Sequence, residues 1–346
     1  MTSVAEPYPQ PNVPETKSGS RKKKALALLL LLGIAASTFL AVRYLQTGKP
    51  ISKIAGPMVP APVQSLLQSD PVYVDSRWDI TRPLGVAAGP NGTMYVTESA
   101  GDRLIRGFDA KGAQFAAFAP AGTDNLNRLP TYVAVSPAGL VYVSDQMLRS
   151  VNIYSATGEP VGQVAAPSAE GWGPTALAFD RAGNLYVADV FGAAHRVLVY
   201  DAQGALQLSF GKAGTGPGEF SFPNGIAADS KGNIYVADSG NGRVQAFDRT
   251  GTLLWAIGRG TGKGDLALPR GIAVDDAHNL LYVVDTTDQS VKVYDISGVS
   301  PKLALTMGGQ GAAADSLRFP NSVALATGER TIYIADRENN RVAIFK

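Results

Sequence analysis

The chain repeats one pattern six times after residue 82. A proline opens an apolar segment at intervals of 44 to 51 residues, at Pro83, Pro130, Pro174, Pro223, Pro269 and Pro320. A tyrosine in the next apolar segment keeps the same interval, at Tyr95, Tyr142, Tyr186, Tyr235, Tyr282 and Tyr333. A period of about 20–50 residues is typical of solenoids, propellers and arrays, whose units bury their apolar faces against one another.

Each repeat contains four short apolar segments separated by turn signals. Asn91-Gly92 and Lys231-Gly232-Asn233 lie between the first and second segments, and Thr250-Gly251 lies between the third and fourth. Such signals are typical of hairpins between antiparallel strands. Four antiparallel strands, here named a to d, make one propeller blade. We therefore predict an all-β, six-bladed β-propeller, since a β-solenoid would have shorter coils and parallel strands.

One position of strand a is always alanine, at Ala87, Ala134, Ala178, Ala227, Ala273 and Ala324. The six innermost strands of a propeller converge on the central axis, where small side chains fit best. We interpret this alanine ring as a packing requirement rather than a functional site.

The sixth repeat reaches Lys346 directly after strand c and therefore lacks an outer strand. An unpaired outer edge is exposed to other chains. We expect residues 62–80 to supply the missing strand and so close the ring through its two ends. In complete repeats strand d ends about a dozen residues before the next proline, as between Phe210 and Pro223, which favours the part near 63–74.

Composition separates the N-terminal region from the propeller. The formal charge is +2, but residues 1–60 hold eight basic and two acidic residues, so residues 61–346 carry −4. A mildly acidic domain lacks the basic surface that neutralises phosphates, which argues against nucleic-acid binding. The chain has no cysteine, which excludes disulfides, thiolate metal sites and cysteine nucleophiles.

Residues 25–42 form an uncharged apolar run. A helix of this length spans roughly 27 Å, close to the thickness of a bilayer core. Four basic residues at 21–24 precede the run, so the N-terminus is predicted to be cytoplasmic and the propeller extracytoplasmic, periplasmic or extracellular. We predict a disordered cytoplasmic tail (1–24), a transmembrane signal anchor (25–45), a stalk rich in proline and glycine (46–61) and the propeller (62–346). A cleaved signal peptide and a buried core helix are the alternatives.

Three segments resemble the NHL repeat. FPNGIAADSKGNIYVADSGNGRVQAFDRTG at 222–251 matches it in nearly every position, and residues 268–295 and 319–346 are similar. The repeats that start at 83, 130 and 174 resemble it more loosely. The resemblance covers about residues 82–346 and implies a six-bladed NHL propeller. Relatives with this fold include enzymes, sensor ectodomains and modules that bind RNA or partner proteins, so the fold alone does not determine an activity.

An acid follows each repeat tyrosine by three residues, at Glu98, Asp145, Asp189, Asp238, Asp285 and Asp336. Arg103, Arg196, Arg243 and Arg341 begin strand c nearby, and an acid facing them can also accept amide protons and fix the turn between strands b and c. Ser150 and Ser290 replace arginine in repeats two and five. Asp145 and Asp285 are therefore the acids we expect to lack the arginine partner, and they are candidate binding residues.

The residue after each repeat proline is expected to surround the mouth of the central channel on the face of the b–c turns. Except for Leu84 these residues are polar, namely Thr131, Thr175, Asn224, Arg270 and Asn321. Such side chains suit hydrogen bonding to a peptide, a sugar or water. The alternative interpretation is a solvated channel mouth without a ligand.

The two histidines are predicted to lie at opposite ends of the blades. His195 lies in a b–c turn on the presumed binding face, whereas His278 lies in an a–b turn. NHL-like peptide-amidating lyases, which resemble this fold, use a zinc site rich in histidine, and two separated histidines cannot supply it. Lactonase-type propellers hold calcium with carboxylates around the axis, and no such cluster is recognisable here. The sequence thus predicts no catalytic residue, metal or cofactor.

Trp172 and Phe191 lie in connecting segments and could form an aromatic recognition patch, although aromatic residues more often fill gaps between blades. Taken together, the sequence favours a membrane-tethered binding or scaffolding module for a protein, peptide or glycan, which it would recognise on the face of the b–c turns. The alternative is a propeller enzyme, similar to peptide-amidating lyases or lactonases, that acts at the channel mouth.

Overall fold

The computed structural model describes residues 71–77, 79–168, 171–259, 266–310, 313–326 and 331–346. The predicted tail, anchor and stalk lie outside the described residues. Within the described ranges, no helix is both long and apolar enough to cross a membrane.

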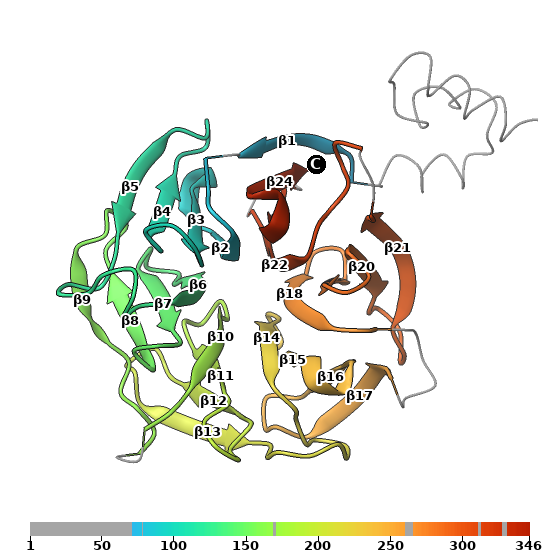
Figure 1. The fold of residues 1–346 in the computed structure, drawn as a ribbon. Helices are drawn as coiled ribbons and strands as arrows, with labels where there is room; N and C mark the ends of the chain where they lie inside the picture. The colour runs from blue at the N-terminus through green and yellow to red at the C-terminus, as the bar shows by residue number, and fades with distance from the viewer. Residues whose placement is uncertain (1–70, 78, 169–170, 260–265, 311–312, 327–330) are drawn as a thin grey trace, which may run out of the picture. The chain divides into compact units, whose positions relative to one another are not determined.

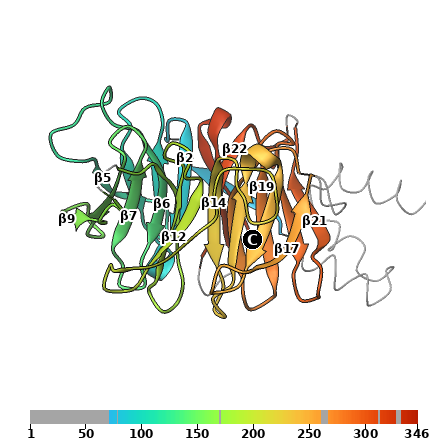
Figure 2. The same cartoon turned by 90° about the horizontal axis from the view of Figure 1, so that it is seen from below.

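Six four-stranded antiparallel sheets are arranged in a ring around a central axis (Figures 1 and 2). The predicted all-β, six-bladed propeller is thereby confirmed. Blade one contains β2 (Pro83–Ala88), β3 (Met94–Glu98), β4 (Ile105–Phe108) and β5 (Gln114–Phe118). Blade two contains β6 (Pro130–Val135), β7 (Val141–Asp145), β8 (Ser150–Tyr154) and β9 (Pro160–Gln163). Blade three contains β10 (Pro174–Phe179), β11 (Leu185–Asp189), β12 (Arg196–Tyr200) and β13 (Leu206–Phe210).

The second half of the ring follows the same order. Blade four contains β14 (Pro223–Ala228), β15 (Ile234–Asp238), β16 (Arg243–Phe247) and β17 (Leu253–Gly258). Blade five contains β18 (Pro269–Asp275), β19 (Leu280–Asp285), β20 (Ser290–Asp295) and β21 (Lys302–Gly308). Blade six contains β22 (Pro320–Leu325), β23 (Ile332–Asp336), β24 (Arg341–Phe345) and β1 (Tyr73–Arg77). Three short 3₁₀ turns complete the described elements: η1 (Pro90–Gly92), η2 (Ser239–Asn241) and η3 (Arg337–Asn339).

The repeated residues occupy equivalent positions of the ladders. Each repeat proline is the first residue of strand a and lies opposite the acid that ends strand b, as Pro223 lies opposite Asp238. Proline is tolerated at the first residue of a strand because its missing N–H removes no hydrogen bond from the interior of the sheet. Each ring alanine lies opposite the repeat tyrosine, as Ala227 lies opposite Tyr235. Buried clusters then join neighbouring blades: Val244 of blade four packs in one cluster with Val283 of blade five.

Adjacent inner strands approach closely at the third residue of strand a. A Cβ atom on Gly225 would lie 1.8 Å from the carbonyl oxygen of Arg270, and one on Gly271 would lie 2.5 Å from the Cα of Ser322. Glycine is required at these two positions because any side chain would push the inner strands apart. The narrow axis therefore depends on the glycines as well as on the alanine ring.

The sixth blade is completed by β1, which pairs with β24 through partners such as Ser76 and Ala343. Two further backbone bonds between Val72 and Lys346, of 2.7 and 2.9 Å, extend this ladder. The closing strand thus comes from the segment 62–80, but later than the favoured range 63–74. The connector to Pro83 is shorter here than the twelve residues between β13 and β14, so the strand lies closer to the repeat.

Candidate functional site

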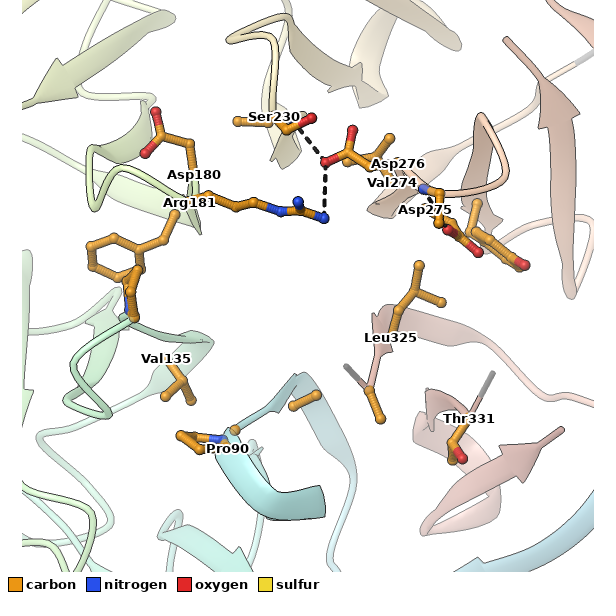
Figure 3. A pocket seen from close by; sticks show the side chains of 18 of the residues that line it. Pro90, Val135, Asp180, Arg181, Ser230, Val274, Asp275, Asp276, Leu325 and Thr331 are labelled. Carbon is orange, nitrogen blue, oxygen red and sulfur yellow. Dashed lines mark hydrogen bonds and ion pairs between the residues drawn. The ribbon is translucent and has the colours of Figure 1, made fainter. Parts of the chain in front are cut away.

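A cavity of about 800 Å³ occupies the end of the central channel where strands a turn into strands b, here called the a–b end (Figure 3). All six blades contribute to it. Its apolar wall is made by the residues that directly follow the alanine ring, namely Ala88, Val135, Phe179, Ala228, Val274 and Leu325. One residue beyond the alanine ring the channel therefore widens into the cavity, where four of the six wall residues are larger than alanine.

The rim of this cavity is polar and comes mainly from blades three, four and five. The side chain of Arg181 extends toward Asp276, with its Nη2 3.8 Å from the Oδ2 of that acid (Figure 3). The same oxygen accepts a 2.9 Å bond from the backbone N–H of Ser230. Asp276 therefore links the a–b turns of three neighbouring blades across one side of the opening.

Asp180 at this rim is committed to its own turn. Its carboxylate accepts hydrogen bonds from the backbone and side-chain nitrogens of Asn184, at 2.9 and 2.7 Å, and from the Tyr186 hydroxyl at 3.1 Å. Burial, followed by the charge of Asp180, raises the pKa of Tyr186. Asp180 accordingly fixes the turn between β10 and β11, and its negative charge remains at the cavity rim.

His278 lies beside Asp275, with 2.8 Å between Nδ1 and Oδ2, and 48% of its side chain is exposed. The backbone N–H groups of Ala277 and His278 also donate to Oδ1 of Asp275. The His278 ring is thus partly open to solvent at the rim. Among the described residues, no three His, Asp or Glu side chains are grouped so that they could hold a metal ion.

The acids that end strands b are fully buried at the opposite end of the channel, the b–c end. Each accepts backbone amide protons from the segment that enters its blade. The amide of Leu129 donates to both oxygens of Asp145 at 3.0 Å, and the amide of Ser221 donates to Asp238 at 2.6 Å. These bonds fix the segment that precedes strand a, whereas the predicted role of the acids was to fix the turn between strands b and c.

The cation partners of these acids differ in part from the prediction. Arg196, Arg243 and Arg341 contact their acids as expected, at 3.0, 2.8 and 2.7 Å. In blade one, however, Glu98 contacts Arg106 rather than Arg103.

Asp285 faces Ser290 at the position of the arginine, but Lys292 supplies another cation, with its Nζ 3.0 Å from the carboxylate. Lys292 follows Ser290, the direct partner of Asp285, by two residues, so it shares the same face of β20. Asp145 accepts bonds from the amides of Met147 and Leu148 in addition to Leu129. Both candidate acids are buried, and their carboxylate oxygens already interact with other groups of the protein.

Most of the predicted polar residues at the channel mouth make hydrogen bonds to other groups of the protein. The Thr131 hydroxyl lies 3.0 Å from the hydroxyl of Ser144, and the Thr175 hydroxyl donates to the carbonyl of Pro223 at 2.9 Å. The buried Asn321 donates to the carbonyl of Leu84 at 2.8 Å. Thr175 and Asn321 thus hold the inner strands of adjacent blades together, whereas Thr131 bonds within blade two. Of the predicted polar residues, Asn224 and Arg270 remain half-buried.

His195 and Phe191 lie on the predicted b–c side. His195 is buried, with Nδ1 3.2 Å from the carbonyl oxygen of Phe220 and its ring 4.7 Å from that of Phe222. Phe191 is half-buried beneath the Arg149 guanidinium, 5.1 Å away. Both side chains therefore take part in local packing.

Trp172 does not belong to a surface patch. Only 2% of it is exposed, and it packs in a buried cluster beside Tyr200. Although Trp172 precedes β10 in a connecting segment, the gap between blades is deep enough to bury its ring.

The sequence profile of the NHL repeat matches residues 220–247 and 317–345. The chain carries NHL repeats. These matched residues coincide with blades four and six, where the arginine of strand c contacts the acid that ends strand b.

Curated relatives of this NHL propeller include the NHL repeat-containing protein 3 of Mus musculus and of Homo sapiens. Each is 34% identical over 118 residues, which is 31% of this chain. The chain spans about a third (34%) of the length of these relatives.

Solved structures with the same fold include a streptogramin B lyase, with a TM-score of 0.56 and 14% identity over 80% of this chain and 96% of that chain. A virginiamycin B lyase from Staphylococcus aureus has a TM-score of 0.52 and 14% identity over 77% of this chain and 81% of that chain. A chain of a nidogen/laminin complex has a TM-score of 0.52 and 16% identity over 65% of this chain and 79% of that chain. At such identities the similarity concerns the fold.

Proposed function

We propose that this NHL propeller is a binding module that takes a ligand, or one segment of a partner, into the cavity at the a–b end. The observation that carries the proposal is the cavity itself, which has a volume of about 800 Å³, an apolar wall contributed by all six blades and a polar rim mainly from blades three, four and five. Ligand sites in proteins typically enclose about 300–1,000 Å³ and have mainly apolar walls with a few polar groups that fix orientation.

The rim favours a ligand that carries a positive charge. Three acids line the opening, Asp180, Asp275 and Asp276, against one arginine, Arg181. With His278 neutral, the rim carries a formal charge of −2. An apolar body with an amine or guanidinium group fits this arrangement, because the apolar wall would bury the body and the acids would attract the cation.

We further propose that residues 25–45 hold the protein at a membrane, with the propeller on the extracytoplasmic side. The support is the uncharged run at 25–42 and the basic residues that precede it. Cell fractionation and protease protection of the full chain test this part. Release of the protein by alkaline carbonate, or protection of the propeller in spheroplasts or intact cells, would contradict it.

The cavity is tested with a pair of probes that differ in charge alone, phenethylamine and 2-phenylethanol, titrated into the full chain by ligand-observed NMR. We expect the amine to bind more tightly. Ala228→Trp fills the wall of the cavity and should abolish binding of both probes. Ala202→Trp is the matched control, because Ala202 is exposed in a c–d turn outside the cavity lining. Equal binding by wild type and Ala228→Trp would refute the proposal.

The b–c face is a second candidate site, for a protein or peptide partner. Phe222 and Phe319 are exposed there, directly before the repeat prolines of blades four and six. Both have positive φ angles, 48° and 49°, although a bulky residue before proline normally adopts an extended conformation. Strained exposed aromatic residues of this kind are typical of binding surfaces. Substituting both with serine should abolish partner capture while leaving amine binding in the cavity unchanged.

A further inference from the structure

Three arginines from three consecutive blades gather at the b–c end of the channel. Arg82 precedes β2 of blade one, Arg270 is the second residue of β18 in blade five, and Arg337 begins η3 of blade six. The Nη2 of Arg82 and the Nε of Arg337 lie 2.5 and 3.6 Å from the same oxygen of Glu338. We call Arg82, Arg270 and Arg337 the arginine cluster.

Charge within the arginine cluster is poorly balanced. Glu338 is the one acid that contacts it in the described residues, and Arg270 instead donates to the neutral amide oxygen of Asn321 at 2.9 Å. Burial, followed by the charges of Arg82 and Arg270, lowers the pKa of Arg337. The Nε atoms of all three arginines are buried without a hydrogen-bond partner in the described structure. Buried donors of this kind are unfavourable unless another group satisfies them.

Tyr132 adds a further donor from the opposite side of the channel. It is the third residue of β6, a position occupied elsewhere by small residues, namely Gly85, Ala176, Gly225, Gly271 and Ser322. Blade two lies across the axis from blade five, so β6 faces β18 (Figure 1). Tyr132 is 8% exposed, and its hydroxyl makes no hydrogen bond of good geometry in the described structure, although the side chain of Asn321 lies near it.

The surroundings of this hydroxyl point toward the arginine cluster. Burial raises the pKa of Tyr132, whereas the charge of Arg270 and the side chain of Asn321 act in the opposite direction. Tyr132 thus lies within interaction range of Arg270 in blade five and Asn321 in blade six. A tyrosine at a position that otherwise holds small residues, with its hydroxyl unsatisfied, is not explained by packing alone.

We infer that the arginine cluster and Tyr132 form a second site, which binds the carboxylate group of a ligand at the b–c end of the channel. A carboxylate offers acceptors only, and its planar form matches the forked donors of arginine. Glu338 already shows how one carboxylate lies between Arg82 and Arg337. A second carboxylate would satisfy the unpaired donors on the side of Arg270 and Tyr132 and would offset half of the formal charge of +2 that the three arginines and Glu338 leave.

The site is open to solvent from the b–c face. The side chains of Arg82 and Arg337 are 42% and 31% exposed, whereas Tyr132 lies deeper. A ligand would thus enter past the two exposed arginines and reach the phenol at the base. The site formed by the arginine cluster and Tyr132 lies at the opposite end of the channel from the cavity. Binding there does not require that the cavity be occupied.

The test uses succinate as the probe, with neutral succinamide as its control, in isothermal titration and thermal unfolding of the full chain. We expect succinate to bind and to raise the melting temperature, and succinamide to do neither. Arg270→Gln and Arg337→Gln should each weaken succinate binding at least tenfold. Arg249→Gln removes an exposed arginine from a c–d turn at the other end of the molecule and should bind as wild type does.

Two outcomes would overturn the inference. Equal succinate affinity in wild type, Arg270→Gln and Arg337→Gln would show that the arginine cluster is not the site, and equal affinity for inorganic phosphate would contradict its assignment to a carboxylate. Tyr132→Phe keeps the buried ring and removes only the hydroxyl, so it remains informative if an arginine variant fails to fold. We expect this variant to bind succinate several-fold more weakly and to retain phenethylamine binding.

Discussion

Substituting Gly225 with alanine should severely destabilise the propeller. The new Cβ would lie 1.8 Å from the carbonyl oxygen of Arg270, so β14 and β18 would have to separate by roughly 1.6 Å to reach the 3.4 Å of ordinary contact. Overpacking of a core typically costs about 1–3 kcal/mol, and more where the neighbour cannot move. The obstacle here is backbone in a paired strand, so no rotamer change relieves it. We expect a loss of at least about 3 kcal/mol, less the roughly 0.4–1 kcal/mol that alanine gains through the unfolded chain.

The assay is urea unfolding of the full chain, followed by tryptophan fluorescence, with Gly162→Ala as the control. Gly162 lies in the outer strand β9, has an ordinary φ angle and has no heavy atom within 4 Å of the new Cβ. The control should therefore unfold at the wild-type midpoint or slightly above it. Similar midpoints for Gly225→Ala and Gly162→Ala would refute the argument that β14 and β18 lie too close together at Gly225 for a side chain.

Three further outcomes follow from the structure. Arg243→Met should cost about 3–5 kcal/mol in urea unfolding, because it leaves the buried Asp238 without its cation, and adding Asp238→Asn should recover part of the loss. Burial raises the pKa of Tyr200 to about 12, so the folded chain keeps a proton that the unfolded chain releases near pH 10, and stability should fall as pH rises from 10 to 12. Tyr200→Phe should make this decrease of stability with pH less steep and should lower the free energy of unfolding by about 1 kcal/mol at pH 7. An unchanged dependence of stability on pH would contradict this. Ser76→Pro should weaken pairing with β24 and expose its edge, which light scattering would detect as association; a monodisperse variant would argue against β1 as an essential strand.

The repeat architecture was predictable because its determinants are local and recur six times. The proline, alanine and tyrosine positions each mark one place in the blade, and their spacing gave the number of blades. The pairing of Ala227 with Tyr235 is reproduced in every blade. Closure by the segment 62–80 could be expected because an unpaired outer edge has to be covered.

The candidate sites were less predictable, since they depend on which side chains meet across the axis. Lys292 reaches Asp285 from two residues beyond the position compared between repeats, so alignment alone missed this pair. Tyr132 carried a usable signal, because it is the one large residue at a position of small residues. The acids of the cavity rim come from the a–b turns of two different blades, so their arrangement around one opening could be recognised only once those turns were placed.

The pairing of β1 with β24 also sets the order in which the protein can be completed during synthesis. Tyr73 and its partner Phe345 are 272 residues apart. At a translation rate of about 5–20 residues per second, β1 would leave the ribosome roughly 15–55 s before its partner exists. Until then the nascent ring has two unprotected sides, β1 and the inner strand of blade one. Chaperones that hold early segments during this interval would therefore affect its yield more than its final stability.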